Sequence, residues 1–260
     1  MTPRWSTVAL HTGAQRVLAE RGGLAVTIGF YVMVVSVLAG LWRAAAHANG
    51  GSLAGYSAVA LTWYIVTSES VTVALNIRMI ENIGEDIGSG AVAVELLRPA
   101  PVLGVRLATE LGTALPKLAV CVTAGMVVAT VTAGGPPEPR TLLLAAPSVV
   151  LAIACNIVSQ HAFAAAAFWL RDAGSTWFLY QKFVFIFGGM LIPLEILPGW
   201  LQRITAVLPF RSMSYIPARL ASGHFEPLLL LEQVGWLAVL LVAASATFAA
   251  GERRLQVVGG

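Results

Sequence analysis

The sequence predicts an all-α, polytopic membrane protein with six transmembrane helices. Six apolar stretches approach or exceed the roughly 20 residues that a helix needs to cross the hydrocarbon core. The chain is 57% hydrophobic and only 11% charged, whereas soluble domains are about 25% charged. The alternation over about 10 residues that marks strands of membrane barrels is absent, so each segment satisfies its backbone hydrogen bonds as a helix. The six stretches are residues 24–42, 53–77, 102–133, 142–170, 177–197 and 228–250.

The composition leaves no room for a large soluble domain. The 16 basic and 13 acidic residues are scattered over 260 positions, which predicts one membrane domain covering residues 1–260. The net charge of +3 is too small and too dispersed to indicate nucleic-acid binding. Cys121 and Cys155 lie inside apolar stretches, where a thiol acts as a small hydrophobic group. The first stretch is longer than the roughly 7–15 apolar residues of a signal peptide, so we expect it to be retained.

The basic residues predict the orientation. Six crossings place both termini on one side of the membrane. The N-terminal segment, the loops after the second and fourth stretches and the C-terminal tail carry ten Lys and Arg residues, whereas the other loops carry five. The positive-inside rule therefore predicts a multi-pass protein of the cell membrane with both termini in the cytoplasm. The excess of arginine over lysine favours a bacterial source.

The segment before the first stretch, residues 4–21, is predicted to be an amphipathic helix at the membrane surface. Leu10, Ala14, Val17 and Leu18 follow a helical spacing and form one apolar face. Such a helix lies in the headgroup region, parallel to the membrane. A polar leader with little structure is the alternative.

The loop after the second stretch, residues 81–101, is predicted to be structured. Apolar residues keep a helical spacing up to Gly88–Gly90, where glycine permits the left-handed end of a helix. A second short helix, Ala91–Arg98, is then stopped by Pro99 and Pro101. A structured element on the cytoplasmic side suggests a docking surface for another protein.

The outer segment, residues 198–227, is apolar but interrupted by Pro198, Pro209 and Pro217. It is too broken to span the membrane and too apolar to lie in water. We expect short helices that re-enter the outer leaflet or pack over the helix bundle.

Two features inside the apolar stretches are candidates for function. Glu69 lies among hydroxyl-bearing residues of the second stretch, and a carboxylate in hydrocarbon costs at least about 2.5–3.5 kcal/mol. It either lines a transport path or senses protons, or, as we favour, it accepts hydrogen bonds from neighbouring hydroxyls and fixes helix packing. The aromatic residues of the fifth stretch, including Phe183 and Phe187, either form an apolar substrate wall or pack the bundle.

Catalytic and metal sites are not expected. The four histidines lie in different segments and none belongs to a recognisable catalytic pattern or to metal-ligand spacing. An ATP-binding loop requires Gly-x-x-x-x-Gly-Lys-Ser/Thr, and neither Lys117 nor Lys182 stands in such a sequence. If ATP drives this protein, another chain binds it.

Taken in order, these features resemble the permease subunit of type-2 ABC exporters, which move drugs, lipids, polysaccharides and natural products out of cells. The resemblance covers essentially the whole chain and begins with the amphipathic N-terminal segment. It continues with the string Asp-Ile-Gly-Ser-Gly-Ala-Val-Ala-Val-Glu-Leu-Leu-Arg-Pro at 86–99. It ends with Gly-Gly-Met-Leu-Ile-Pro-Leu-Glu-Ile-Leu-Pro-Gly-Trp-Leu at 188–201, followed by Leu-Pro-Phe at 208–210. The first string is similar to a subfamily whose operons encode two permeases beside one ATPase.

The resemblance implies roles for particular residues. Residues 91–98 match the coupling helix that enters a cleft of the ATPase, residues 198–220 match the re-entrant helices that cap the path, and spans 2 and 5 line it. The implied coupling residues are Asp86, Val92, Glu95, Leu96 and Arg98; the path residues are Glu69, Phe183 and Phe187; the outer-gate residues are Trp200 and Phe210. The implied partners are two copies of the ATPase, which hold the ATP and Mg²⁺, a second permease, identical or paralogous, and membrane lipid. No cofactor is expected on this chain.

Two other classes of protein remain as alternatives. An ion-gradient-driven secondary transporter usually has paired broken helices in two similar halves. The fifth stretch is interrupted by Gly and Pro but has no clear counterpart. A membrane enzyme or assembly factor is the third alternative. The substrate does not follow from the sequence.

Overall fold

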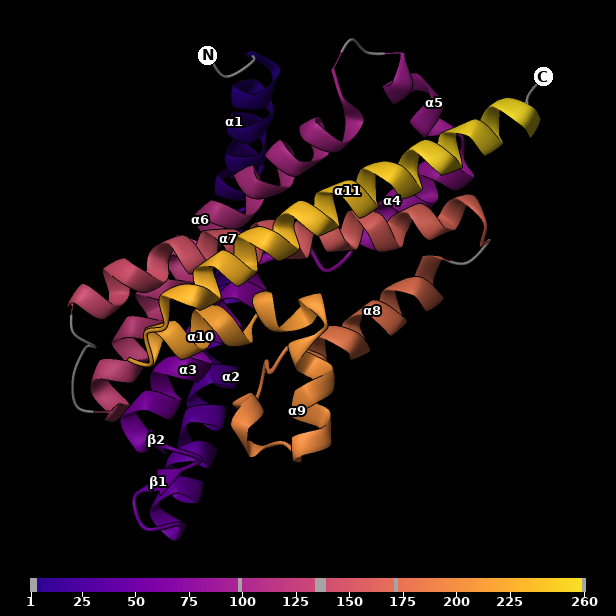
Figure 1. The fold of residues 1–260 in the computed structure, drawn as a ribbon. Coiled ribbons are helices and arrows are strands. Elements are labelled where there is room, and N and C mark those ends of the chain that lie inside the picture. Colours follow the sequence, from indigo (N-terminus) through magenta and orange to yellow (C-terminus); the bar gives the residue numbers. More distant parts are fainter. Residues whose placement is uncertain (1–3, 98–99, 134–138, 171–172, 259–260) are drawn as a thin grey trace.

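The computed structural model describes residues 4–97, 100–133, 139–170 and 173–258, most of them helical (Figure 1). The long helices form an elongated bundle, and a cluster of short helices covers one part of it. The elements are α1 (Arg4–Ala19), α2 (Arg21–Ala48), β1 (Ser52–Leu53), β2 (Tyr56–Ser57), α3 (Ala58–Ala74), α4 (Met79–Gly88), α5 (Ala91–Leu96), α6 (Val102–Ala133), α7 (Pro139–Ala164), η1 (Ala165–Phe168), α8 (Ala173–Phe187), η2 (Leu194–Ile196), α9 (Gly199–Ala206), η3 (Pro209–Ser212), α10 (Tyr215–Ala221) and α11 (Pro227–Val258).

Five helical segments in the described part of the chain are long and apolar enough to cross a membrane. They are Arg21–Ala48, Ala58–Gly88, Val102–Ala133, Thr141–Phe168 and Pro227–Arg254. They correspond to the first, second, third, fourth and sixth apolar stretches of the sequence. The predicted class, a polytopic all-α membrane protein, is therefore confirmed, while the count of six crossings stays a prediction.

The second apolar stretch differs from the expected single helix. It begins in an antiparallel hairpin that pairs Ser52 with Ser57, and α3 starts only after it. The Ser57 side chain accepts a hydrogen bond from the Ala60 amide at 3.1 Å, which caps the helix. The helix then breaks after Ala74, before α4 begins at Met79. Gly90 has the left-handed φ of 78°, which agrees with the predicted glycine stop between α4 and α5.

The fifth stretch is also helical over a shorter range than expected. We predicted one span over residues 177–197, but α8 ends at Phe187 and has 15 residues. Gly189 takes a left-handed φ of 63° and turns the chain out of the helix. The carbonyl groups that follow bind elsewhere: Tyr64 donates to Gly189 O, and Ser68 donates to Met190 O at 2.7 Å. Irregular backbone is stable beside a membrane span only when the protein satisfies its polar groups in this way.

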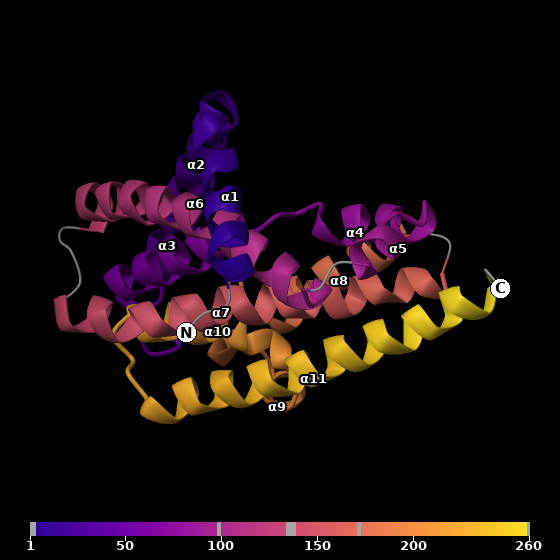
Figure 2. The ribbon, with the colours of Figure 1, turned by 90° about the horizontal axis from the view of Figure 1, so that it is seen from above.

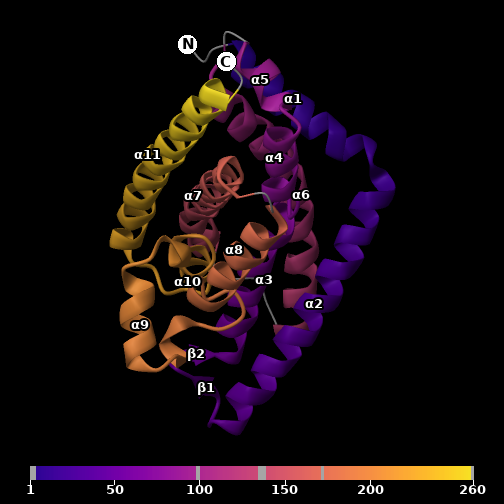
Figure 3. The same ribbon diagram turned by 90° about the vertical axis from the view of Figure 1, so that its right-hand side faces the viewer.

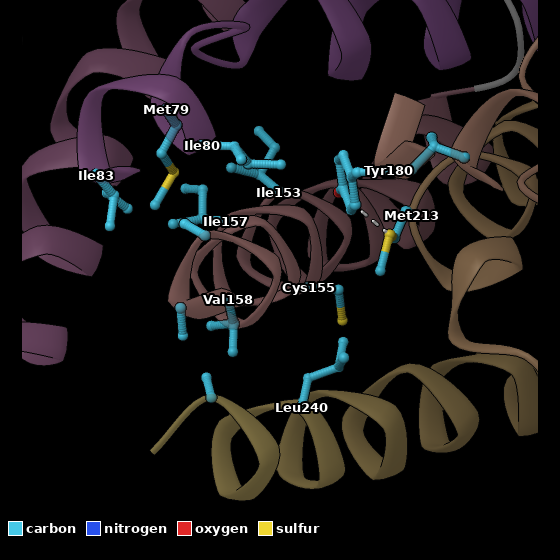
Figure 4. Packing of buried hydrophobic residues seen from close by; sticks show 14 of the residues in the cluster. Met79, Ile80, Ile83, Ile153, Cys155, Ile157, Val158, Tyr180, Met213 and Leu240 are labelled. Atoms are coloured by element: carbon cyan, nitrogen blue, oxygen red, sulfur yellow. Dashed lines mark hydrogen bonds between the residues drawn. The ribbon is translucent and has the colours of Figure 1, made fainter. Parts of the chain in front are cut away.

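The larger apolar core surrounds α7. Ile153 and Ile157 of α7 face buried residues of α4, whereas Val158, on the other side of α7, faces α11, which contributes Leu240 (Figure 4). Helix α4 was expected to extend beyond the membrane with an acidic face. Its apolar face, including Ile80, is buried in this core, and its position relative to the membrane stays a prediction. Figure 2 shows α7 and α11 running side by side, in agreement with their extensive contact.

The molecule has two distinct ends, which Figure 3 separates clearly. One end carries α1, α5 and the C-terminal part of α11, and we call it the α5 end. The other carries the β1–β2 hairpin and α9, and we call it the hairpin end. At the α5 end, α1 packs closely on the first half of α6.

Candidate functional site

An ionic network joins α4 and α5 to α6 at the α5 end. The Arg106 guanidinium of α6 donates to Glu95 from Nε at 3.0 Å and from Nη2 at 2.7 Å, and Nη2 also donates to Asp86 at 2.7 Å. Only 14% of the Arg106 side chain is exposed. Hydrogen bonds between charged groups are stronger than neutral ones. Two of the predicted coupling residues, Asp86 and Glu95, are thereby fixed to the third long helix.

Helix α5 presents a different apolar surface from the one expected. Val92, a predicted contact for a partner, is fully buried in the core of this chain. The exposed apolar side chains are Val94, 62% exposed, and Leu97, 85% exposed. Positions three apart lie on the same face of a helix, so these two form one patch. The Leu96 side chain and the whole of Arg98, both predicted coupling residues, lie outside the described part of the structure.

A cavity of about 130 Å³ lies between the end of α3, α7 and α8. Its polar lining includes Asn156 and Gln160 of α7, both buried, and Tyr180 of α8, whose hydroxyl donates to Asn156 Oδ1 at 3.1 Å. Trp177 and Phe185 line the apolar side. Binding pockets for small molecules usually measure about 300–1,000 Å³. This cavity is therefore large enough for only part of a ligand.

Phe183 and Phe187 do not line this cavity, which differs from the expectation that they form a substrate wall. They lie in an aromatic cluster with Phe163 of α7 and Phe210 of η3. The ring centroids are 6.3 Å apart for Phe163 and Phe183, and 5.5 Å for Phe183 and Phe210. This arrangement favours the alternative that these rings pack the bundle. The residues of α8 that face the cavity are neighbours of these two phenylalanines. The sequence places all of them in one aromatic stretch and does not show which face of the helix each one occupies.

The two predicted gate residues, Trp200 and Phe210, differ in environment. Trp200 of α9 is 60% exposed, whereas Phe210 is 6% exposed and belongs to the aromatic cluster. The short helices predicted for this segment are present as α9, η3 and α10. A single apolar gate containing both rings is not seen in this structure.

Glu69 is 4% exposed, and the hydroxyl groups around it bind elsewhere. Ser68 donates to Met190 O, Ser70 donates to Val66 O at 2.7 Å, and Thr72 donates to Ser68 O at 2.9 Å. The carboxylate oxygen Oε1 has no hydrogen-bond partner among the described residues. The hydroxyls of Ser68, Ser70 and Thr72 therefore do not supply the hydrogen bonds that the favoured explanation expects. Glu69 also does not line the cavity beside α8.

A polar cluster near the hairpin end was not anticipated from the sequence. Glu195 Oε1 accepts hydrogen bonds from the hydroxyls of Tyr56, at 3.1 Å, and Tyr215, at 2.7 Å, and from Arg219. Burial, and then the adjacent carboxylate, raises the pKa of Tyr56 and Tyr215, so both remain protonated donors. The cluster joins the β1–β2 hairpin, η2 and α10. In the sequence, the only indications of this cluster were a carboxylate at the end of the fifth stretch and an arginine in the outer segment. Their spacing does not show that the two side chains pair.

We expect Arg219→Gln to destabilise the protein, because it leaves the Glu195 carboxylate without its cation. Removing one partner of a charged hydrogen bond costs about 1–3 kcal/mol, and both side chains are only about a quarter exposed, at 24% and 27%. Thermal unfolding in detergent measures the loss. The Glu195→Gln, Arg219→Gln double variant should recover part of it, and Arg203→Gln, on an exposed arginine, is the control. Equal stability of the Arg219 variant and the control would contradict this role.

The long apolar helices define the class of this protein as a multi-pass membrane protein. A model of the family described as ABC-2 family transporter protein matches residues 30–259. Because the match covers most of the chain, the protein belongs to the ABC-2 transporter family. A search of curated proteins found no match. The predicted resemblance to type-2 ABC permeases is thereby confirmed.

Proposed function

We propose that this chain is the membrane-spanning permease of an ATP-driven exporter, with ATP and Mg²⁺ bound and hydrolysed on a separate ATPase subunit. Membership of the ABC-2 family supports the ATPase-driven mechanism over an ion-gradient-driven one. Two ATPase copies and a second permease, identical or paralogous, would complete the transporter. The α5 end would face the cytoplasm, since the basic segments of the sequence gather there.

The observation that carries the proposal is the exposed patch of Val94 and Leu97 on a rigidly held helix. Both side chains are more than half exposed, although α5 itself is tied to α6 through Glu95 and Arg106. Exposed apolar side chains on a fixed element are typical of a surface that binds another protein. A movement of the ATPase at this patch would pass through the Arg106 network into α6.

The cavity beside α8 supports a transport path in the same way. It is lined by aromatic rings and by uncharged amide and hydroxyl groups, which suits an uncharged substrate that forms hydrogen bonds. A second permease facing α8 would enlarge it. Alternating access then needs only that substrate binds differently in the inward and outward states.

The test is retention of the ATPase subunit that co-purifies with the wild-type chain. We expect Val94→Asp with Leu97→Asp to detach it, because a carboxylate buried unpaired at an interface costs several kcal/mol. Val207→Asp is the matched control: this valine is also exposed, at 70%, but it follows α9 near the hairpin end. Insertion of the permease should not change. Full retention of the ATPase by the double variant would place the docking surface elsewhere and overturn the proposal for α5.

A further inference from the structure

A polar pocket of about 290 Å³ opens where α1 meets α2, against the middle of α6. Arg16 comes from the last turn of α1, Glu20 from the junction of the two helices, and Lys117 from α6. None of these residues belongs to the coupling network, to the cavity beside α8 or to the cluster at the hairpin end. The pocket shares only Asn76 of its described lining with the cavity beside α8, and Arg16 also lines a neighbouring pocket beside Glu95 and Arg106.

Two cations face this pocket without a partner. The side chains of Arg16 and Lys117 form no hydrogen bond or ion pair with another described residue, although the Arg16 carbonyl accepts a hydrogen bond from the Glu20 amide. Glu110, which lies seven residues before Lys117 on α6, accepts a hydrogen bond from the Asn76 side chain at 3.2 Å. Arginine and lysine side chains only donate hydrogen bonds, so a ligand here must bring oxygen acceptors and negative charge.

The described wall of the pocket carries one negative group as well. Glu20 is exposed at its edge, so the two cations and this carboxylate sum to one positive charge. The hydroxyl of Thr27 is already used, since it donates to Gly23 O at 2.9 Å. A singly charged anion with several oxygens complements this arrangement. A phosphodiester has that charge and those acceptors.

The position of the pocket along α6 matches the membrane surface. Helix α1 crosses α6 at Gly112, and Lys117 lies five residues further along, about 7.5 Å at the helical rise. From that crossing to the end of α6 at Ala133 about 20 residues remain, which is the length that crosses the hydrocarbon core. On that count the border between headgroups and acyl chains lies near Gly112, and Lys117 lies about 7.5 Å further into the membrane. A lysine side chain is long enough to extend back from there to the headgroups.

An apolar surface suited to acyl chains begins beside the pocket. Gly23 and Thr27 of α2 line the pocket, and Val26, Phe30 and Met33, on the adjacent side of the same helix, are each more than half exposed. These three side chains follow helical spacing and point away from the bundle. The acyl chains of a lipid would gain binding free energy from contact with this surface, whereas a free anion would not.

We infer that this pocket binds the headgroup of a phospholipid, with the phosphodiester between Arg16 and Lys117 and the acyl chains along α2. The bound lipid fastens the junction of α1 and α2 to α6. The inference requires only that the chain lies in a membrane, so it stands or fails independently of the proposed export function.

Lipid binding to the purified transporter, measured by native mass spectrometry, tests this inference. After removal of lipid, the protein is titrated with phosphatidylglycerol and, separately, with diacylglycerol of the same chains. Wild type should bind phosphatidylglycerol and not diacylglycerol. Arg16→Gln with Lys117→Gln should weaken binding about 30-fold, given the usual contribution of a basic residue near a lipid surface.

The control variant removes the same two charges elsewhere. Lys182→Gln with Arg253→Gln also replaces one lysine and one arginine, both exposed, and should bind phosphatidylglycerol like wild type. Equal loss in both double variants would show non-specific attraction and overturn the site. Displacement of the lipid by inorganic phosphate at matched concentration would show a free-anion site and overturn the lipid assignment. Folding of each variant is checked by its elution in size-exclusion chromatography.

Discussion

Arg106→Gln is expected to uncouple ATP hydrolysis from transport. Glutamine cannot make the three charged hydrogen bonds by which Arg106 joins Glu95 of α5 and Asp86 of α4 to α6. Hydrogen bonds to charged groups are worth about 1.5–3 kcal/mol each. Helix α5 should therefore lose its fixed position on α6, while its exposed patch can still bind the ATPase.

The measurement compares ATPase turnover with transport in reconstituted vesicles. In the variant, transport should fall at least about tenfold, which corresponds to one such hydrogen bond, while the ATPase still co-purifies. Arg78→Gln is the matched control, because its pair with Glu81 lies in the same region but leaves 65% of the arginine side chain exposed. Exposed ion pairs of that kind contribute little to the stability of a protein. Normal transport by the Arg106 variant would show that this network does not couple ATP hydrolysis to transport.

Gly112→Leu is expected to displace α1 from the bundle. A Cβ atom on residue 112 would lie 2.1 Å from Leu10 O, and one on Gly13 would lie 2.3 Å from Thr109 O. Both obstacles are backbone atoms, so no side-chain rotation relieves them. Over-packing of this kind costs about 1–3 kcal/mol even where side chains can adjust. The two helices touch closely because small residues meet at their crossing.

Limited proteolysis at the junction of α1 and α2 measures this displacement. Gly112→Leu should expose the junction to cleavage and lower the temperature of thermal unfolding. Gly40→Leu is the control, since a Cβ at that position of α2 meets no atom within 4 Å. A protease pattern identical to wild type would mean that α1 is not held by this crossing.

The overall class of this protein followed from its sequence. Hydrophobic length alone located the five long helices that are apolar enough to cross a membrane, because the bilayer sets the same minimum length for each of them. The ends of α6 at Val102 and Ala133 agree with the predicted stretch. The break between α4 and α5 was predictable as well, since only glycine readily adopts the left-handed backbone seen at Gly90.

The tertiary structure decided which face of each helix packs in the bundle and which face lines a cavity. Composition groups Phe183 with Phe185, but only packing against Phe210 turns one ring into the bundle and leaves the other beside a cavity. The end of α8 depends on Tyr64 and Ser68, which lie more than a hundred residues earlier and capture its following carbonyl groups.

The charged contacts, like the helix faces, depended on the tertiary structure. The family resemblance implied coupling roles for Glu95 and Asp86, but only the tertiary structure shows that both pair with Arg106 of α6. Glu195 and Arg219 likewise meet through a turn of the chain that no periodicity encodes. The length of an apolar stretch is a local property, so it follows from the sequence. Ion pairs and the roles of helix faces depend on which distant segments of the chain pack together.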